Sequence, residues 1–292
     1  MTGESGFLPG QRLWTPWRLS YVGGDRPSPG CVFCGALEGK DDAISLIVHR
    51  GEHTFAIMNL FPYNAGHLMV VPYSHTRDLT DLTQPARAEM AELTASFCAG
   101  LRLVMGCDGL NIGMNLGSAA GAGIAEHVHQ HIVPRWIGDA NFMPIVGGVK
   151  VLPELVPATY AKIRAEVARQ KSGADTVKLV MIAPDRAGLY FAGDDLPAIP
   201  LTDGASVWKS AMNTIATEST LLELLGWAGD ASTAADALEP PVLAFSYSPR
   251  MGNGTSSFRL VSFEHARTLL GEAQFTSVVE LVGRLELDTP KL

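Results

Sequence analysis

The chain has 292 residues, of which 47% are hydrophobic, enough to build a core and to form two compact units. Its 22 basic and 30 acidic residues give a net charge of -8, which argues against a broad electrostatic footprint on DNA or RNA. Residues 1–6 lack the pattern of a secretory signal, and no apolar run approaches the ~20 residues of a membrane span. We therefore expect a cytoplasmic globular protein.

The first half of the chain predicts an antiparallel sheet with a packed helix. After an irregular start rich in Gly and Pro, strands are expected at 43–49, 54–60 and 67–72, and the turn residues 62–66 join the last two. Residues 85–105 carry apolar side chains at helical spacing, which predicts a long amphipathic helix: Met90, Leu93, Phe97, Leu101 and Val104. Strands at 110–116 and 128–134 follow.

A second helix is expected from 153 to about 170, and residues 172–175 resemble a helix stop and linker. Beyond it we expect strands at 177–183 and 188–192, a helix within 207–225, strands at 242–248 and 257–263, and a final helix near 277–286. The predicted organisation is an N-terminal segment (1–40), a larger α+β domain (41–172) and a smaller accessory α+β domain (176–292).

Three histidines on alternate residues, His127, His129 and His131, are the most informative feature of the sequence. Because side chains on a strand repeat every second residue, all three imidazoles should face one side and form one site. A Gly- and Ala-rich stretch, 117–123, places exposed backbone amides just before them, which suggests phosphate chemistry. The alternatives are a metal-binding patch or a chance run on a polar strand face.

A neutral imidazole is a competent nucleophile toward phosphorus, and a hydrogen bond at one ring nitrogen can orient the other. Attack by the central histidine on a nucleotide polyphosphate would give a nucleotidyl-histidine, which divides one difficult displacement into two easier ones. Neighbouring histidines and loop amides would supply donors for the developing charge.

Cys31 and Cys34 have the spacing of one half of a tetrahedral zinc site. Such a site needs two more ligands, and the alternative is a pair of free thiols. Redox use of the thioredoxin type is disfavoured because no helix is expected to start after Cys31. Four cysteines in a chain of this length argue against a disulfide framework, and Cys98 and Cys107 are expected to be core or loop thiols.

The run 127–133 resembles the motif of the histidine-triad (HIT) family, with Gln130 in place of an apolar residue. Position 130 points away from the triad face, so this departure concerns packing or subunit contact more than chemistry. The segments 13–18, 59–72, 113–117 and 134–136 are similar to the bacterial diadenosine-polyphosphate phosphorylase branch of that family. The resemblance covers about residues 12–170.

The resemblance implies a role for each matching residue. His129 would be the nucleophile that carries AMP, and His131 would contact phosphate. Asn59 and His67 would lie near the ribose and nucleoside, while the phosphates would be held by Asn115, Gly121, Ala122 and Gly123. A structural zinc ion would be bound by Cys31, Cys34, His75 and His127, which would fix the geometry around His129.

The implied activity is cleavage of diadenosine tetraphosphate to ATP and ADP, with inorganic phosphate as the acceptor, or hydrolysis with water as the acceptor. Other hypotheses are a HIT hydrolase releasing AMP from phosphoramidates or nucleotide conjugates, a specialised biosynthetic nucleotidyltransferase, and a non-catalytic nucleotide-binding regulator. The resemblance also implies a homodimer, and no organic cofactor, nucleic acid polymer or membrane is expected as a partner.

Residues 176–292 carry no comparable set of functional residues. Their element order and a helix ending at 221–227 faintly resemble a Nudix domain, whose magnesium site needs a cluster of carboxylates. Aligned on Gly226, Glu223 is the one acid that remains. The segment is expected to be either a degenerate Nudix-like domain or an unrelated α+β accessory domain.

Overall fold

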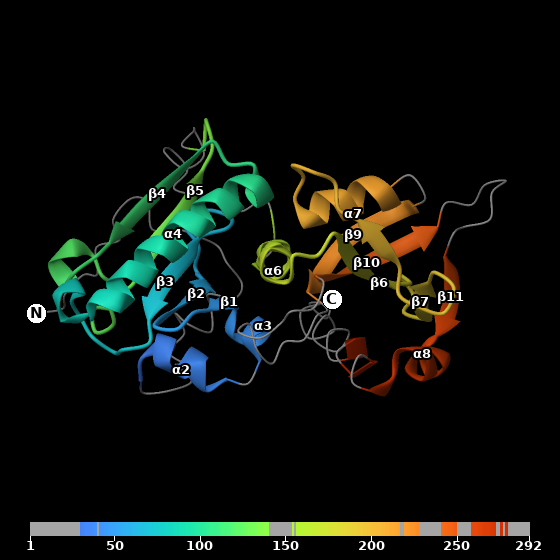
Figure 1. Cartoon of the computed structure of the whole chain (residues 1–292), viewed down its shortest axis with the longest axis horizontal. Coiled ribbons are helices and arrows are strands. Elements are labelled where there is room, and N and C mark those ends of the chain that lie inside the picture. Colours follow the sequence, from blue (N-terminus) through green and yellow to red (C-terminus); the bar gives the residue numbers. More distant parts are fainter. Residues whose placement is uncertain are drawn as a thin grey trace, which may run out of the picture.

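A computed structural model of the chain describes the secondary structure of residues 30–39, 41–139, 154, 156–216, 219–227, 241–249, 258–272, 275–276 and 278–279. The motif at 13–18 lies outside these residues. Two sheets are present, with helix α6 (Val156–Ser172) between them, as Figure 1 shows. No described helix has both the length and the apolar character needed to cross a membrane.

The first sheet is antiparallel throughout, as the sequence predicts. Its strand order is β1-β2-β3-β5-β4, formed by β1 (Ile47–Arg50), β2 (Thr54–Met58), β3 (Leu68–Pro72), β5 (Gln130–Arg135) and β4 (Gly109–Met114). Helix α4 (Gln84–Met105) packs on one face and buries four of the five apolar positions predicted for it. Thr83 caps its start, and Gly106 ends it in the left-handed conformation.

The opposite face of the sheet is covered by a helix that the sequence analysis missed. Alternation along β3 places Leu68 and Val70 in the core under α4, whereas Met69 and Val71 pack with Phe33. Phe33 belongs to α2 (Val32–Glu38), so the expectation of an irregular segment at Cys31 is wrong. Helix α2 begins directly after Cys31. The absence of a helix there therefore no longer argues against redox chemistry.

The predicted strand at 43–49 is also partly wrong. Residues Asp42–Ser45 form the short helix α3, because the Asp41 carboxylate accepts hydrogen bonds from the backbone N–H groups of Ala43 and Ile44. The strand β1 starts two residues later, at Ile47.

The second sheet is mixed, with the order β11-β7-β6-β10-β9 and β8 paired to β6. Its strands are β6 (Thr176–Ile182), β7 (Gly188–Phe191), β8 (Ala198–Pro200), β9 (Ser219–Trp227), β10 (Val242–Pro249) and β11 (Arg259–Ser262). Strands β6 and β10 run parallel, and the other pairs are antiparallel. Helices α7 (Val207–Ile215) and α8 (Phe263–Leu270) accompany it.

The prediction of a helix ending at 221–227 is wrong, because those residues form β9 and pair with β10. Glu223 therefore lies opposite Ser246 on a strand rather than on the helix that a Nudix box requires. This removes the structural basis for the degenerate Nudix box. The final helix expected near 277–286 lies almost entirely outside the described residues, and α8 was not predicted.

Helix α6 contacts elements of both halves, namely α4 and β1 on one side and β9 and α7 on the other (Figure 1). Its Tyr160 hydroxyl donates to the carbonyl of Ile47 at 3.1 Å. One buried apolar cluster runs from α4 through α6 to β6 and β10. The boundary after residue 172 stays a prediction about domains, but the hydrophobic core continues across it.

Candidate functional site

Strand β5, which lies between β3 and β4, determines where the triad lies. His131 pairs with Met69 of β3 and Gly113 of β4, whereas His127 and His129 lie just before β5, which starts two residues later than predicted. The ring centroids of His129 and His131 are 4.8 Å apart. Gln130 points to the other face, where its amide donates to the Thr94 hydroxyl of α4 at 2.7 Å. The predicted alternation across position 130 is confirmed.

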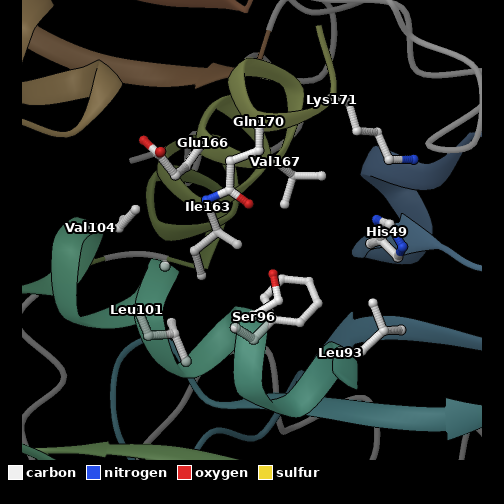
Figure 2. Close-up of a pocket in the computed structure, with 12 residues that line it drawn as sticks. His49, Leu93, Ser96, Leu101, Val104, Ile163, Glu166, Val167, Gln170 and Lys171 are labelled. Atoms are coloured by element: carbon white, nitrogen blue, oxygen red, sulfur yellow. The ribbon is translucent and has the colours of Figure 1, made fainter. Parts of the chain in front are cut away.

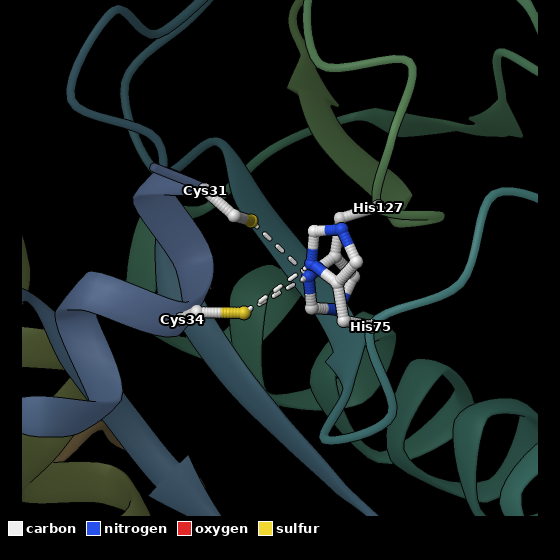
Figure 3. Close-up of side chains that lie close together, drawn as sticks. All are labelled: Cys31, Cys34, His75 and His127. Atoms are coloured by element: carbon white, nitrogen blue, oxygen red, sulfur yellow. Dashed lines mark hydrogen bonds between the residues drawn. The ribbon is translucent and has the colours of Figure 1, made fainter. Parts of the chain in front are cut away.

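His127 is fully buried and belongs to a cluster with Cys31, Cys34 and His75, shown in Figure 3. The four ligand atoms lie within 4.8 Å of one another. His127 Nε2 lies 2.9 Å from the carbonyl oxygen of Pro72. A carbonyl can only accept, so the His127 proton is on Nε2 and the lone pair of Nδ1 faces the two sulfurs.

The spacing of this cluster fits a zinc ion. In a zinc site the Zn–S distance is about 2.3 Å and the Zn–N distance about 2.0–2.1 Å. At a tetrahedral angle, the sulfur and the nitrogen are then about 3.5 Å apart. The S···N distances are 3.3 Å for Cys31–His127, 3.4 Å for Cys34–His75 and 3.8 Å for Cys34–His127. These residues can hold a metal, and the thiolate and imidazole donor set is one that suits zinc.

His129 is 5% exposed and lies against Phe33, with ring centroids 4.9 Å apart. Its Nδ1 is 2.8 Å from the carbonyl oxygen of His127. That carbonyl must accept, so Nδ1 carries the proton and Nε2 presents a lone pair. Burial lowers the pKa of His129, which keeps the ring neutral at physiological pH. The arrangement has the protonation that a nucleophilic imidazole needs.

His131 is half-buried and contacts the buried His67. Its Nδ1 lies 2.9 Å from Nε2 of His67, and the backbone N–H of Tyr63 donates to Nδ1 of His67 at 3.1 Å. Burial, with a smaller contribution from His129, lowers the pKa of His131 to about 4. The exposed ring of Tyr63 stacks obliquely on His67.

The turn that carries Tyr63 is fixed by residues that the sequence analysis did not single out. Asn64 is buried, and its amide donates to the carbonyl of Pro134 and to the carboxylate of Asp139. The same carboxylate binds the Arg135 guanidinium, which holds the pKa of Asp139 well below its usual range. The sequence signal was weak, because Asn64 looked like an ordinary turn residue.

The remaining predicted residues lie around the triad. Asn115 directly follows Met114, which pairs with Gln130, so it lies at the same end of the sheet as His129. Gly117 and Gly121 adopt φ of +77° and +83°, which favours glycine, and the loop leads to Ile124, packed against the Phe33 cluster. Asn59 precedes the turn, and its side-chain oxygen accepts from the N–H of Phe61.

A separate cavity of about 140 Å³ lies between α4 and α6, away from the triad (Figure 2). His49 and Lys171 stand at one end of it and Leu101 and Val104 at the other. His49 lines this cavity. Burial and the nearby cations Lys171 and Arg164 lower its pKa to about 4.

Comparison with known proteins assigns the family. A HIT domain is matched over residues 41–136. The AP-4-A phosphorylase of Mycobacterium tuberculosis is 43% identical over 168 residues, which cover 55% of this chain and 86% of that protein. The chain belongs to the HIT family. An uncharacterized HIT-like protein of Methanocaldococcus jannaschii is 33% identical over 111 residues, covering 38% of this chain and 83% of its own.

A solved HIT structure is also similar to this chain. The zinc-bound histidine triad family protein of Mycobacterium smegmatis is 29% identical and covers 50% of this chain and 98% of its own, with a TM-score of 0.41. The 43% identity with a curated relative makes this chain a homologue of AP-4-A phosphorylase within the HIT family.

Proposed function

We propose that this HIT protein is a nucleotidyl-transferring enzyme that cleaves diadenosine tetraphosphate-type dinucleoside polyphosphates by phosphorolysis, with His129 as the nucleophile. One observation carries this proposal. The 2.8 Å hydrogen bond from His129 Nδ1 to the His127 carbonyl leaves Nε2 unprotonated. Its lone pair is then available for attack in a site beside the Gly-rich loop. The identity with AP-4-A phosphorylase supports the choice of substrate class.

The reaction has two displacements. His129 Nε2 attacks the α-phosphorus, a P–N bond forms, and the P–O bond to the remaining polyphosphate breaks, so that ATP leaves with the bonding electrons. An oxygen of inorganic phosphate then attacks the same phosphorus, the P–N bond breaks, and ADP is released. With water as the acceptor, the second step gives AMP.

The surrounding residues bind and orient the phosphates. His131 is assigned to an oxygen of the reacting phosphoryl group, where charge grows in the transition state. Asn115 and the backbone of Gly121, Ala122 and Gly123 are assigned to the other phosphate oxygens. Asn59 is assigned to the nucleoside, because it precedes the turn next to the triad.

We further propose that the metal cluster holds a structural zinc ion. The four residues Cys31, Cys34, His75 and His127 would bind it, and the ion would supply a cross-link rather than a reacting group. Through His127, whose carbonyl accepts from His129, this cross-link keeps α2 and the triad in register.

A second copy of the chain is the proposed protein partner, as the family resemblance implies. Within the described residues, one edge of β4 has no neighbouring strand, and Ile112 on this strand is 51% exposed. The hollow beside it, formed with α4, is lined by Met90, Thr94, Ile112, Met114 and Gln130, among others.

The test is turnover of diadenosine tetraphosphate by the full chain with and without inorganic phosphate. ADP plus ATP formed when phosphate is present supports the phosphorylase. AMP plus ATP formed equally well without phosphate would establish the hydrolase instead. If the chain binds the dinucleotide but turns over neither it nor any phosphoramidate, the protein is a nucleotide-binding regulator instead.

A further inference from the structure

His67 is buried too deeply to contact a nucleoside. Its side chain is fully buried, and both ring nitrogens are used within the protein. The strand register explains why His67 meets His131. Met69 stands opposite His131, and His67 lies two residues before Met69, directly ahead of β3, so it projects to the same side of the sheet. His67 therefore faces the triad histidine rather than the solvent.

The hydrogen bonds fix where the protons sit. The backbone N–H of Tyr63 can only donate, so Nδ1 of His67 must be the acceptor. A neutral imidazole carries one proton, which then lies on Nε2 of His67. That N–H points at Nδ1 of His131, 2.9 Å away, so this nitrogen accepts and the proton of His131 must lie on its Nε2.

The chain of hydrogen bonds starts at the Tyr63 N–H, and the turn that carries it is fixed in place. Asn64 ties the turn to Pro134 and Asp139 beside the Tyr63 amide. The Tyr63 ring stands 4.8 Å from the His67 ring and 5.9 Å from the His131 ring. A proton on Nδ1 of His67 would point straight at the Tyr63 N–H, so this geometry keeps Nδ1 unprotonated and the ring neutral.

We propose that His67 is a positioning residue that sets the tautomer of His131, so that His131 presents a neutral Nε2–H donor to the reacting phosphoryl group. This inference rests on the proposed function and reassigns His67 from nucleoside contact to control of the triad. His129 and His131 then present opposite groups two residues apart, a lone pair for attack and an N–H for the phosphoryl oxygen. A neutral donor does this without placing a cation beside the nucleophile.

Two substitutions that are isosteric with each other separate this role from packing. His67→Gln keeps a donor toward His131 and an acceptor for the Tyr63 amide, whereas His67→Glu offers oxygen atoms alone and accepts from Nδ1 of His131. Nitrogen-15 NMR of the imidazole rings, in the metal-loaded full chain without substrate, reads the tautomer directly. Metal content and thermal unfolding check that both variants fold.

We expect the wild-type chain and His67→Gln to show His131 protonated on Nε2, and His67→Glu to show it protonated on Nδ1. If the proposed reaction is present, His67→Glu should lower kcat by about 10²–10³, as for loss of one oxyanion donor, while His67→Gln restores most of it. A wild-type His131 protonated on Nδ1, or an unchanged tautomer in a folded His67→Glu, overturns the inference. Because the NMR measurement needs no substrate, it stands apart from failure of the proposed function.

Discussion

Trp208 of α7 donates its indole N–H to the carbonyl oxygen of Val104, 3.1 Å away in the last turn of α4. The last carbonyls of a helix have no partner within the helix, so a side chain from the second half of the chain satisfies one in the first. The Lys162 ammonium of α6 lies 3.8 Å from the centre of the same indole. Three helices thus meet at one residue.

Replacing Trp208 with Phe should lower the free energy of unfolding by about 0.5–1.5 kcal/mol, because the hydrogen bond is lost and most of the packing is kept. Urea unfolding of the full chain measures this. Unchanged stability would mean that water replaces the indole at the Val104 carbonyl, and that this contact does not help to join the two halves.

The metal cluster predicts one zinc ion per chain. Cys34→Ser should lose the metal, and the melting temperature should fall, because three ligands cannot complete the tetrahedral site. Cys98→Ser, in α4 and outside the cluster, is the matched control and should keep the metal. A wild-type chain purified without a chelator that holds no metal would contradict the zinc proposal.

Stability should depend on pH through His49. Its folded-state pKa of about 4 lies below the ordinary value of 6.5. Between these two pH values the unfolded chain therefore binds more protons than the folded chain. Stability from this residue is therefore complete above pH 6.5 and falls as the pH drops toward 4. His131 contributes in the same direction.

Comparison with His49→Gln isolates the contribution of His49, because the slope of stability against pH between 6.5 and 4 should be smaller in that variant. His265→Gln, on an exposed residue of α8, controls for the loss of a histidine. Equal slopes in His49→Gln and the wild type would show that His49 is not held neutral by its surroundings.

Gly100 occupies the interior of α4, where it faces the cavity between α4 and α6. A Cβ at this position would meet no atom within 4 Å, so Gly100→Ala should raise the unfolding free energy by about 1 kcal/mol. Gly66→Ala is the contrasting variant. It should destabilise, because Gly66 has φ of +79° and its Cβ would lie 3.2 Å from Met105 and Pro134.

Periodicity predicted the elements that have one buried face. Helix α4 is the example, since its apolar positions match helical spacing. Strands β2 and β3 are buried at every position, so their short apolar runs next to turn residues predicted them rather than alternation. The leucine-rich run at 221–225 fits a helix and a buried strand equally well, and pairing with β10 decides for the strand. Helix α2 has seven residues, too few for periodicity to identify.

The site was predictable where the chemistry is local in sequence. The triad spacing and the Cys31–Cys34 pair are visible in the chain, whereas His75 and His127 entered through family resemblance. The place of His67 depends on the pairing of β3 with β5, which sequence spacing does not give. Phe33 lies between the two cysteines and contacts His127 and His129, but packing of this kind has no motif.

The most direct test of the central claim is to trap the covalent intermediate. Wild-type chain mixed with diadenosine tetraphosphate in the absence of phosphate is quenched in alkali, which preserves P–N bonds, and mapped by mass spectrometry. The proposal predicts AMP bound to His129 and no adduct in His129→Ala. AMP on another residue, or full turnover by His129→Ala, would contradict it.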